Sequence, residues 1–196
     1  MKSGAGAGED LARENIPTAL VAVDPRAHAR SELEGEQEAE RHWWLGGTDA
    51  VRRALSIAAV GIPALQGRWG DAAAACSSLL LAHRACGLAK HIVGEERPDG
   101  SDHKSFPSSH AMETSCAATS LALASGSSLG VPAYAAVAWV AYGRLRADRH
   151  HGIDVAAGAA SGAAVAWLAA RVLATRGDAH APVSYTHLTL PTIYSV

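Results

Sequence analysis

Histidine, arginine and aspartate side chains gather in one short segment between Gly143 and Asp154. His150 and Asp154 are four residues apart, so a helix would place both on one face. A carboxylate bonded to one imidazole nitrogen fixes the tautomer and leaves the other nitrogen free to act as a base or nucleophile. Arg144 adds a planar fork that fits phosphate oxygens. His151 competes for the same role at a spacing of three, and a charged loop between two helices would have the same composition.

A second polar group, Pro107-Ser108-Ser109-His110, comes directly before an apolar run. Proline and serine in this place are typical of a helix start. The free N–H groups of a helix N-terminus bind anions, and serine hydroxyls add further donors. His110 would then stand beside a bound anion as a candidate proton donor. The alternative is a plain serine N-cap followed by a surface histidine.

A third group, Lys90 and Arg97, lies at the end of another apolar run. Residues seven apart return to nearly the same face of a helix after two turns, so both side chains could point into one pocket. Arginine offers a fork to phosphate oxygens and lysine a point charge. Pro98 disfavours helix at the residue before it, so we expect the element to stop at Arg97. The solvated basic end of any membrane helix would look the same.

Five apolar runs carry these segments, and short polar stretches separate them. A bilayer span needs about 20 mostly apolar residues, and three of the runs approach that length. Pro63 interrupts the first run, while His83 and Arg84 in the second would have to face the interior of a membrane bundle. No strand-like alternation is sustained, so we expect an all-α, membrane-embedded bundle of about five helices. The runs cover residues 51–67, 71–93, 107–128, 131–143 and 152–173.

Other stretches indicate how such a bundle is packed and flanked. Residues 156–163 are all Ala, Gly or Ser, which lets helices approach closely. Trp43 and Trp44 precede the first apolar run, as an interfacial anchor or as an ordinary core pair. Residues 31–41 are polar and charged, and we expect a solvated helix or a disordered arm there.

The composition narrows the class of function. The net charge is −2 with histidine neutral, which argues against a nucleic-acid partner. Hydrophobic residues make up 48% of the chain but aromatic residues only 5%, so the apolar content is mostly small side chains. We expect Cys76, Cys86 and Cys116 to be small buried hydrophobes, because their spacing fits no metal site. The N-terminus has no signal-peptide pattern, and no metal-ligand pattern stands out among the acidic residues.

Together the three segments resemble the type 2 phosphatidic acid phosphatase family, whose pattern is Lys-x6-Arg-Pro, Pro-Ser-Gly-His and Ser-Arg-x5-His-x3-Asp. The order, the internal spacings and the gaps between segments agree over roughly residues 50–175. Ser109 stands where the pattern has glycine, and Gly143 where it has serine. Neither change removes a reactive group. A match in three parts is highly specific, although each part alone has a simpler explanation.

The resemblance implies a helical core similar to that of the haloperoxidases and a metal-independent phosphatase without a cofactor. His150 would attack phosphorus and form a phospho-histidine, and Asp154 would orient it. His110 would act as general acid and then as general base. The phosphoryl oxygens would be held by Lys90, Arg97, Ser108, Ser109 and Arg144.

The domain organisation expected from this is a polar N-terminal arm (1–48), a phosphatase-like domain (49–177) and a tail (178–196). Residues 183–196 differ in composition from the rest and are similar to the translation of a sequencing adapter, so we expect them not to be native. The high Ala and Gly content indicates a bacterial source, and the resemblance implies a multi-pass membrane protein with its site on the extracytoplasmic side. We therefore expect it in a bacterial inner membrane. Arg171 and Arg176 would then be cytoplasmic, as the positive-inside tendency favours.

An amphiphile is the expected substrate of a site at a bilayer surface. Candidates are phosphatidate, polyprenyl phosphates or diphosphates, and lipid-linked sugar phosphates, and the membrane itself is a partner. Two alternatives remain open. A soluble acid phosphatase or a vanadium-dependent haloperoxidase resembles the same motifs, although the apolar runs argue against a soluble enzyme. A non-catalytic lipid-binding membrane protein would fit the departures at Ser109 and Gly143.

Overall fold

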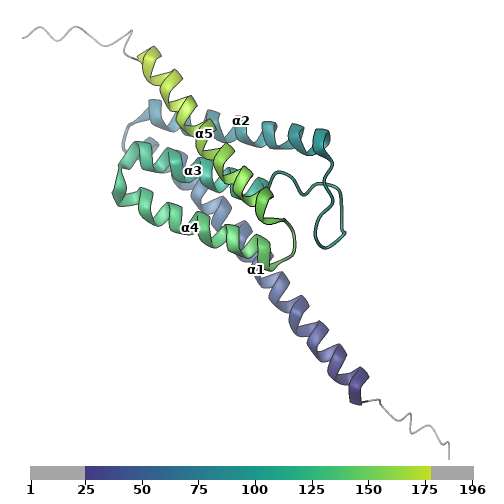
Figure 1. Ribbon diagram of the computed structural model, residues 1–196. Coiled ribbons are helices and arrows are strands. Elements are labelled where there is room, and N and C mark those ends of the chain that lie inside the picture. The colour runs from purple at the N-terminus through teal and green to yellow at the C-terminus, as the bar shows by residue number, and fades with distance from the viewer. Residues whose placement is uncertain (1–24, 178–196) are drawn as a thin grey trace, which may run out of the picture. The chain divides into compact units, whose positions relative to one another are not determined.

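The computed structural model describes residues 25–177, and this part of the chain contains five α-helices and no strand (Figure 1). The expected all-α bundle of about five helices is therefore confirmed. Of these residues, 25–37 belong to one compact unit and 38–177 to a second. The suspected adapter-like tail, 183–196, lies outside the described residues. The helices are α1 (Pro25–Leu65), α2 (Trp69–Val93), α3 (Ser109–Ser125), α4 (Ser127–Arg146) and α5 (Gly152–Gly177).

The first helix is much longer than the apolar run that predicted it. A start at residue 51 is wrong, because α1 already begins at Pro25. The missed part is rich in Glu, Ala, Arg and Leu, which are strong helix formers but give no apolar run. Residues 31–41 form a solvated helix rather than a disordered arm, since they are helical and almost all exposed. Pro63 sits in the last turn of α1, close to the end of the helix at Leu65.

The ends of α2 and α3 follow from local sequence. Gly94 adopts a left-handed conformation (φ 62°) and its N–H donates to the Lys90 carbonyl. Helix α2 therefore ends at Val93, the last residue of the apolar run, and not at Arg97. Ser108 caps α3, because its hydroxyl accepts from the N–H of Ala111. Arg97 therefore lies in the loop between the two helices, and the predicted shared helix face with Lys90 is wrong.

Helix α3 is the centre of the bundle. Every residue from Ala111 to Leu121 is buried, and α3 packs against α2, α4 and α5. Gly158 and Gly162 of α5 lie against the backbone of α3. A Cβ atom at Gly158 would be 2.5 Å from the Ser108 carbonyl oxygen, and one at Gly162 would collide with the Met112 carbonyl. The run of small residues thus allows the close packing expected from the sequence.

The core is built mainly from alanine. Buried apolar side chains include Ala75, Ala117 and Ala118, and few large side chains are fully enclosed. Cys86 and Cys116 are buried as expected, but Cys76 is exposed. The expectation for Cys76 is wrong because it occupies the outer face of α2, whereas its neighbour Ala75 faces inward.

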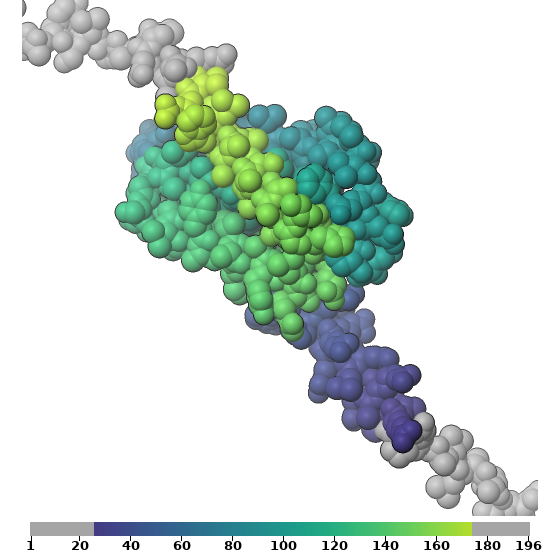
Figure 2. All heavy atoms as spheres, viewed as in Figure 1, coloured from purple at the N-terminus to yellow at the C-terminus, as the bar shows by residue number. Residues whose placement is uncertain are grey.

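Two helices, α2 and α5, are long and apolar enough to cross a membrane. Only 28% of the residues in each apolar window are buried, so neither is an enclosed core helix. Figure 2 shows α5 lying along the outside of the bundle. Large apolar side chains are exposed along both helices, among them Leu80, Leu81, Leu88, Ile92, Trp167, Leu168 and Val172.

The two tryptophans have different surroundings. Trp44 packs against Trp139 and Tyr142 of α4, with ring centroids 5.5 Å and 5.4 Å away. Trp43 also contacts Trp139 but remains largely exposed. The pair therefore joins α1 to α4 and leaves one indole ring at the surface.

Candidate active site

The three segments identified in the sequence meet at one end of the bundle, where α2 and α4 end and α3 and α5 begin (Figure 1). The N–H of Ser108 donates to the carbonyl of Asp154 over 3.0 Å, which joins the second segment to the third. A guanidinium nitrogen of Arg97 donates to the carbonyl of Arg149 at 3.3 Å, which joins the first to the third. Lys90 donates to the carbonyls of Lys104 and Ser105, at 2.5 Å and 3.4 Å.

His150 is buried in the loop just before α5, so its expected place on a shared helix face with Asp154 is wrong. Its Nδ1 lies 2.8 Å from the Ser105 carbonyl oxygen and donates to it. That bond fixes the tautomer and leaves Nε2 with a free lone pair. Burial and the charges of Arg144, Lys90 and Arg97 lower the pKa of His150 to about 3. The imidazole is therefore neutral at neutral pH, as a nucleophile must be.

Asp154 acts on His150 mainly through Ser105. Its Oδ2 is 3.8 Å from His150 Nδ1, which is an ion-pair distance but too long for a hydrogen bond. The same oxygen accepts from the Ser105 hydroxyl and, at 2.8 Å, from the backbone N–H of His151. Asp154 thus holds the residue whose carbonyl orients His150. It also places a negative charge near the ring, where an imidazolium would develop.

His110 faces a carboxylate that the sequence did not indicate. Its Nε2 lies 2.6 Å from Oδ1 of Asp49, in α1. Burial, followed by the charge of Arg144, lowers the pKa of His110 to about 4, although the bond to Asp49 opposes the shift. His110 and His150 both lie outside the two candidate membrane spans. With Nε2 held by Asp49, Nδ1 is the nitrogen that remains for proton exchange.

Arg144 is buried, and its positive charge lowers the pKa of both His110 and His150. Its Nε has no hydrogen-bond partner within residues 25–177. Arg97, in contrast, donates to Asp102 at 2.6 Å, and Arg149 to Asp99 at 2.9 Å. Burial alone would raise the pKa of Asp99, but bonds from Ser101 and Arg149 lower it to about 2. Asp102 and Asp99 thus hold the guanidinium groups of Arg97 and Arg149 in place.

The N-terminus of α3 supplies the other expected anion donors. Ser108 is fully buried and Ser109 is the first helical residue, so its N–H has no partner inside the helix. The Ser109 hydroxyl lies 3.3 Å from the Cys86 sulfur of α2. Serine fits in place of the family's glycine because this side chain is directed toward α2.

Gly143 has a different explanation, since a side chain would not fit there. A Cβ atom would lie 2.6 Å from Cγ2 of Thr48 and 2.7 Å from Cε3 of Trp44, both in α1. The Thr48 hydroxyl bonds to the Trp44 carbonyl at 2.8 Å, so it does not replace the missing serine hydroxyl. Close packing of α1 on α4 accounts for glycine at this position.

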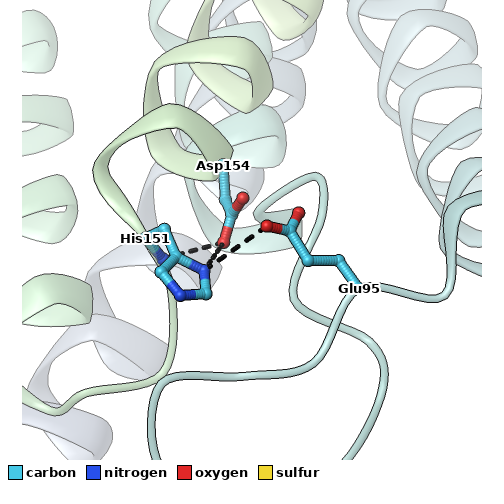
Figure 3. A group of neighbouring side chains, drawn as sticks. All are labelled: Glu95, His151 and Asp154. Atoms are coloured by element: carbon cyan, nitrogen blue, oxygen red, sulfur yellow. Dashed lines mark hydrogen bonds and ion pairs between the residues drawn. The ribbon is translucent and has the colours of Figure 1, made fainter.

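Glu95, His151 and Asp154 form a cluster whose ligand atoms all lie within 4.8 Å of one another (Figure 3). His151 Nδ1 is 3.6 Å from Glu95 and 3.4 Å from Asp154. This spacing could hold a cation. The Asp154 oxygen that faces His151 already accepts two hydrogen bonds, so the cluster also ties the loop after α2 to the start of α5.

Three residues of the site were missed by sequence reasoning. Asp49 is 61 residues from His110 and belongs to no motif. Ser105 stands just before the second segment but was given no role: its carbonyl, which any residue type offers, orients His150, and its hydroxyl donates to Asp154. Arg149 directly precedes His150 in a charged run, and this position next to a candidate nucleophile could have indicated a role in the site.

The comparison with protein families agrees with this geometry. Residues 71–178, more than half of the chain, match the family model of the PAP2 superfamily. The match includes all three segments and leaves α1 outside it. Neither a curated protein nor a solved structure matches the chain. The sequence match, the helical fold and the meeting of the three segments lead to one identification: the chain belongs to the PAP2 superfamily.

Proposed function

We propose that this protein is a metal-independent phosphatase that hydrolyses the phosphate ester of an amphiphile through a phospho-histidine at His150. Membership of the PAP2 superfamily supports a phosphatase-type enzyme. The observation that carries the finer proposal is the buried Arg144, whose Nε is unpaired, beside two histidines of lowered pKa. A buried cation is costly unless an anion joins it, and a phosphoryl group provides that anion together with the oxygen acceptors.

In the first step, His150 Nε2 attacks phosphorus and the bond from phosphorus to the leaving oxygen breaks. His110 donates its proton to that oxygen. Dianion binding favours the protonated form of His110, because negative charge then offsets Arg144. In the second step His110 takes a proton from water, the water oxygen attacks phosphorus, and the P–N bond electrons return to Nε2. The cations Lys90, Arg97 and Arg144 stabilise charge on the equatorial oxygens throughout.

An amphiphilic substrate is supported by the outer surface and by a cavity. The exposed apolar faces of α2 and α5 suit two membrane-crossing helices, and the site lies at one end of both. A cavity of about 350 Å³ opens between α1, α2 and α3, and its lining includes Arg52, which lies near Asp49. Ile57, Leu79 and Leu80 would give an aliphatic chain apolar contacts there. The lining residues are Arg52, Arg53, Ser56, Ile57, Leu79, Leu80, His83 and Glu113.

A bacterial inner membrane, with the site outside the cytoplasm, is part of the same proposal. The exposed loop residue Ser101 gives a test, because Ser101→Cys should react with a membrane-impermeant maleimide in intact cells. A Cys76→Ser background removes the exposed native thiol. Labelling only after the cells are lysed would place the site on the cytoplasmic side.

Phosphate release from lipid phosphates in the presence of EDTA tests the activity. We expect His150→Ala to lower kcat/KM by about a thousandfold or more, as for other enzymes that lose a nucleophile. His151→Ala is the matched control, because it keeps the backbone N–H that binds Asp154. An active His150→Ala variant would refute the mechanism. Activity abolished by EDTA and restored by a divalent cation would assign a metal to the Glu95, His151 and Asp154 cluster.

Two other functions can be separated by the same protein sample. A haloperoxidase would oxidise halide with added vanadate and peroxide. A non-catalytic lipid-binding protein would bind lipid phosphate and release none. Packing accounts for both departures from the family pattern, Ser109 and Gly143, which supports the catalytic proposal.

A further inference from the structure

Glu113 is a buried carboxylate near the start of α3, one turn after His110. It lies 2.5 Å from a guanidinium nitrogen of Arg52 in α1 and 2.9 Å from Nδ1 of His83 in α2. Three helices therefore converge on this one side chain. The proposed mechanism does not use Glu113.

Arg52 connects Glu113 to the site. One of its terminal nitrogens meets Glu113, and the other lies 3.6 Å from Oδ1 of Asp49. That same Asp49 oxygen receives Nε2 of His110 at 2.6 Å. A continuous set of contacts thus leads from the exposed His83 to His110, through Glu113, Arg52 and Asp49. Arg52 and Asp49 both precede the residues that match the superfamily.

Arg52 and His110 both approach Oδ1 of Asp49, so the distance of Arg52 decides whether His110 keeps this acceptor. Arg52 at 3.6 Å is beyond hydrogen-bond distance from Asp49, while His110 is well within it. The short contact with Glu113 holds the Arg52 guanidinium away from Asp49. Without that charge, the partly buried Arg52 would have Asp49 as its nearest acidic partner and would move toward it. His110 would then share Oδ1 of Asp49 with a permanent cation, whereas Arg53 contacts the other oxygen, Oδ2, at 3.4 Å.

We infer that Glu113 is a positioning residue for the general acid and base: it anchors Arg52 so that Asp49 stays available to orient His110. This inference rests on the proposed function and deepens it. The charged groups that act on His110 are Asp49 and Arg52 from α1 and Arg144 from α4, while Arg53 of α1 acts through Asp49 and His83 of α2 through Glu113. Neutralising Glu113 leaves Arg52 uncompensated, which disfavours the imidazolium form of His110.

The test compares Glu113→Gln with the unmodified full-length chain in detergent. A water-soluble aryl phosphate is the substrate, because it leaves the apolar cavity beside Glu113 empty. We expect kcat to fall about tenfold, a part of the whole general acid–base contribution, with KM little changed. The limb of the pH–rate profile that reports loss of the His110 proton should move to lower pH by about half a unit or more.

The control is Asp71→Asn, which also removes a carboxylate from an ion pair, here with Arg68 at 2.6 Å. It lies at the start of α2, at the opposite end from the site, so neither kcat nor the pH profile should change. Glu113→Asp is a second variant in case Glu113→Gln does not fold. It keeps a negative charge on α3 but shortens the side chain that holds Arg52, so the shift of the pH profile should have the same sign and be smaller.

A double variant with Asp49 separates this positioning role from a purely structural one. The double variant of Glu113→Gln and Asp49→Asn should be no slower than Asp49→Asn alone. Additive losses, or a lower melting temperature with an unchanged pH profile, would overturn the inference. If the unmodified protein releases no phosphate, the proposed function fails. The pKa of His110 from its imidazole NMR signal then still decides whether Glu113 acts on it.

Discussion

Restoring the family's serine at Gly143 should destabilise this protein rather than improve it. The new Cβ would lie 2.6 Å from Thr48 Cγ2 and 2.7 Å from Trp44 Cε3. Ordinary carbon contacts begin near 3.5 Å, so α1 and α4 would have to separate locally. Overpacking of this kind costs about 1–3 kcal/mol. For a domain of this size, each kcal/mol lowers the melting temperature by about 2–4 °C.

Thermal unfolding of Gly143→Ser in detergent measures this cost. Gly61→Ser in α1 is the matched control, because a Cβ there meets no atom within 4 Å. Thr48→Ser removes the Cγ2 atom and keeps the hydroxyl, so the double variant with Gly143→Ser should recover part of the lost stability. Phosphatase activity should follow the same order, because Arg144 directly succeeds residue 143. An unchanged melting temperature in Gly143→Ser would refute the packing explanation.

The other predictions concern the hydrogen bonds, the pH and the helix contact around the site. Ser105→Ala keeps the carbonyl that orients His150 but removes the hydroxyl bonded to Asp154, so kcat should fall about tenfold with KM unchanged in steady-state assays. His150 and His110 have folded pKa values of about 3 and about 4, below the unfolded value of 6.5, so the unfolded state binds more protons. Stability should fall as the pH drops from 6.5 toward 4, which unfolding in denaturant at several pH values would show; a constant stability would contradict it. Gly162→Ala should push α5 from α3 and lower the melting temperature, and an unaffected variant would disprove that contact.

The helices of the bundle were predictable because apolar runs and small residues determine how they pack. The sequence indicated four of the five helices to within a few residues at each end. In the first half of α1 it left a solvated helix and a disordered arm open for residues 31–41, because a helix with no apolar face leaves no hydrophobic pattern. The apolar run 71–93 ended with α2, but the extension of that helix to Arg97 was wrong, because Gly94 ends the helix before Pro98 can.

The motif residues were identifiable because each brings a side chain with unusual chemistry. What the sequence could not give is their partners. The acceptor that fixes the His150 tautomer is a carbonyl group, and no residue type is needed to provide it. Asp49 becomes the partner of His110 only because α1 packs beside α3 and α4, which is a property of the tertiary structure.

Helix α1 therefore has more influence on the site than its place outside the superfamily match suggests. It supplies Asp49 to His110, it supplies Arg52 to the Glu113 pair, and its Thr48 contacts Gly143 next to Arg144. Each contact reaches a motif residue or its direct neighbour. A change in α1 that shifts the helix along its axis by one residue, about 1.5 Å, would break all three at once. Variation in α1 is thus a route by which this chain can alter the rate of a site whose motif residues stay the same.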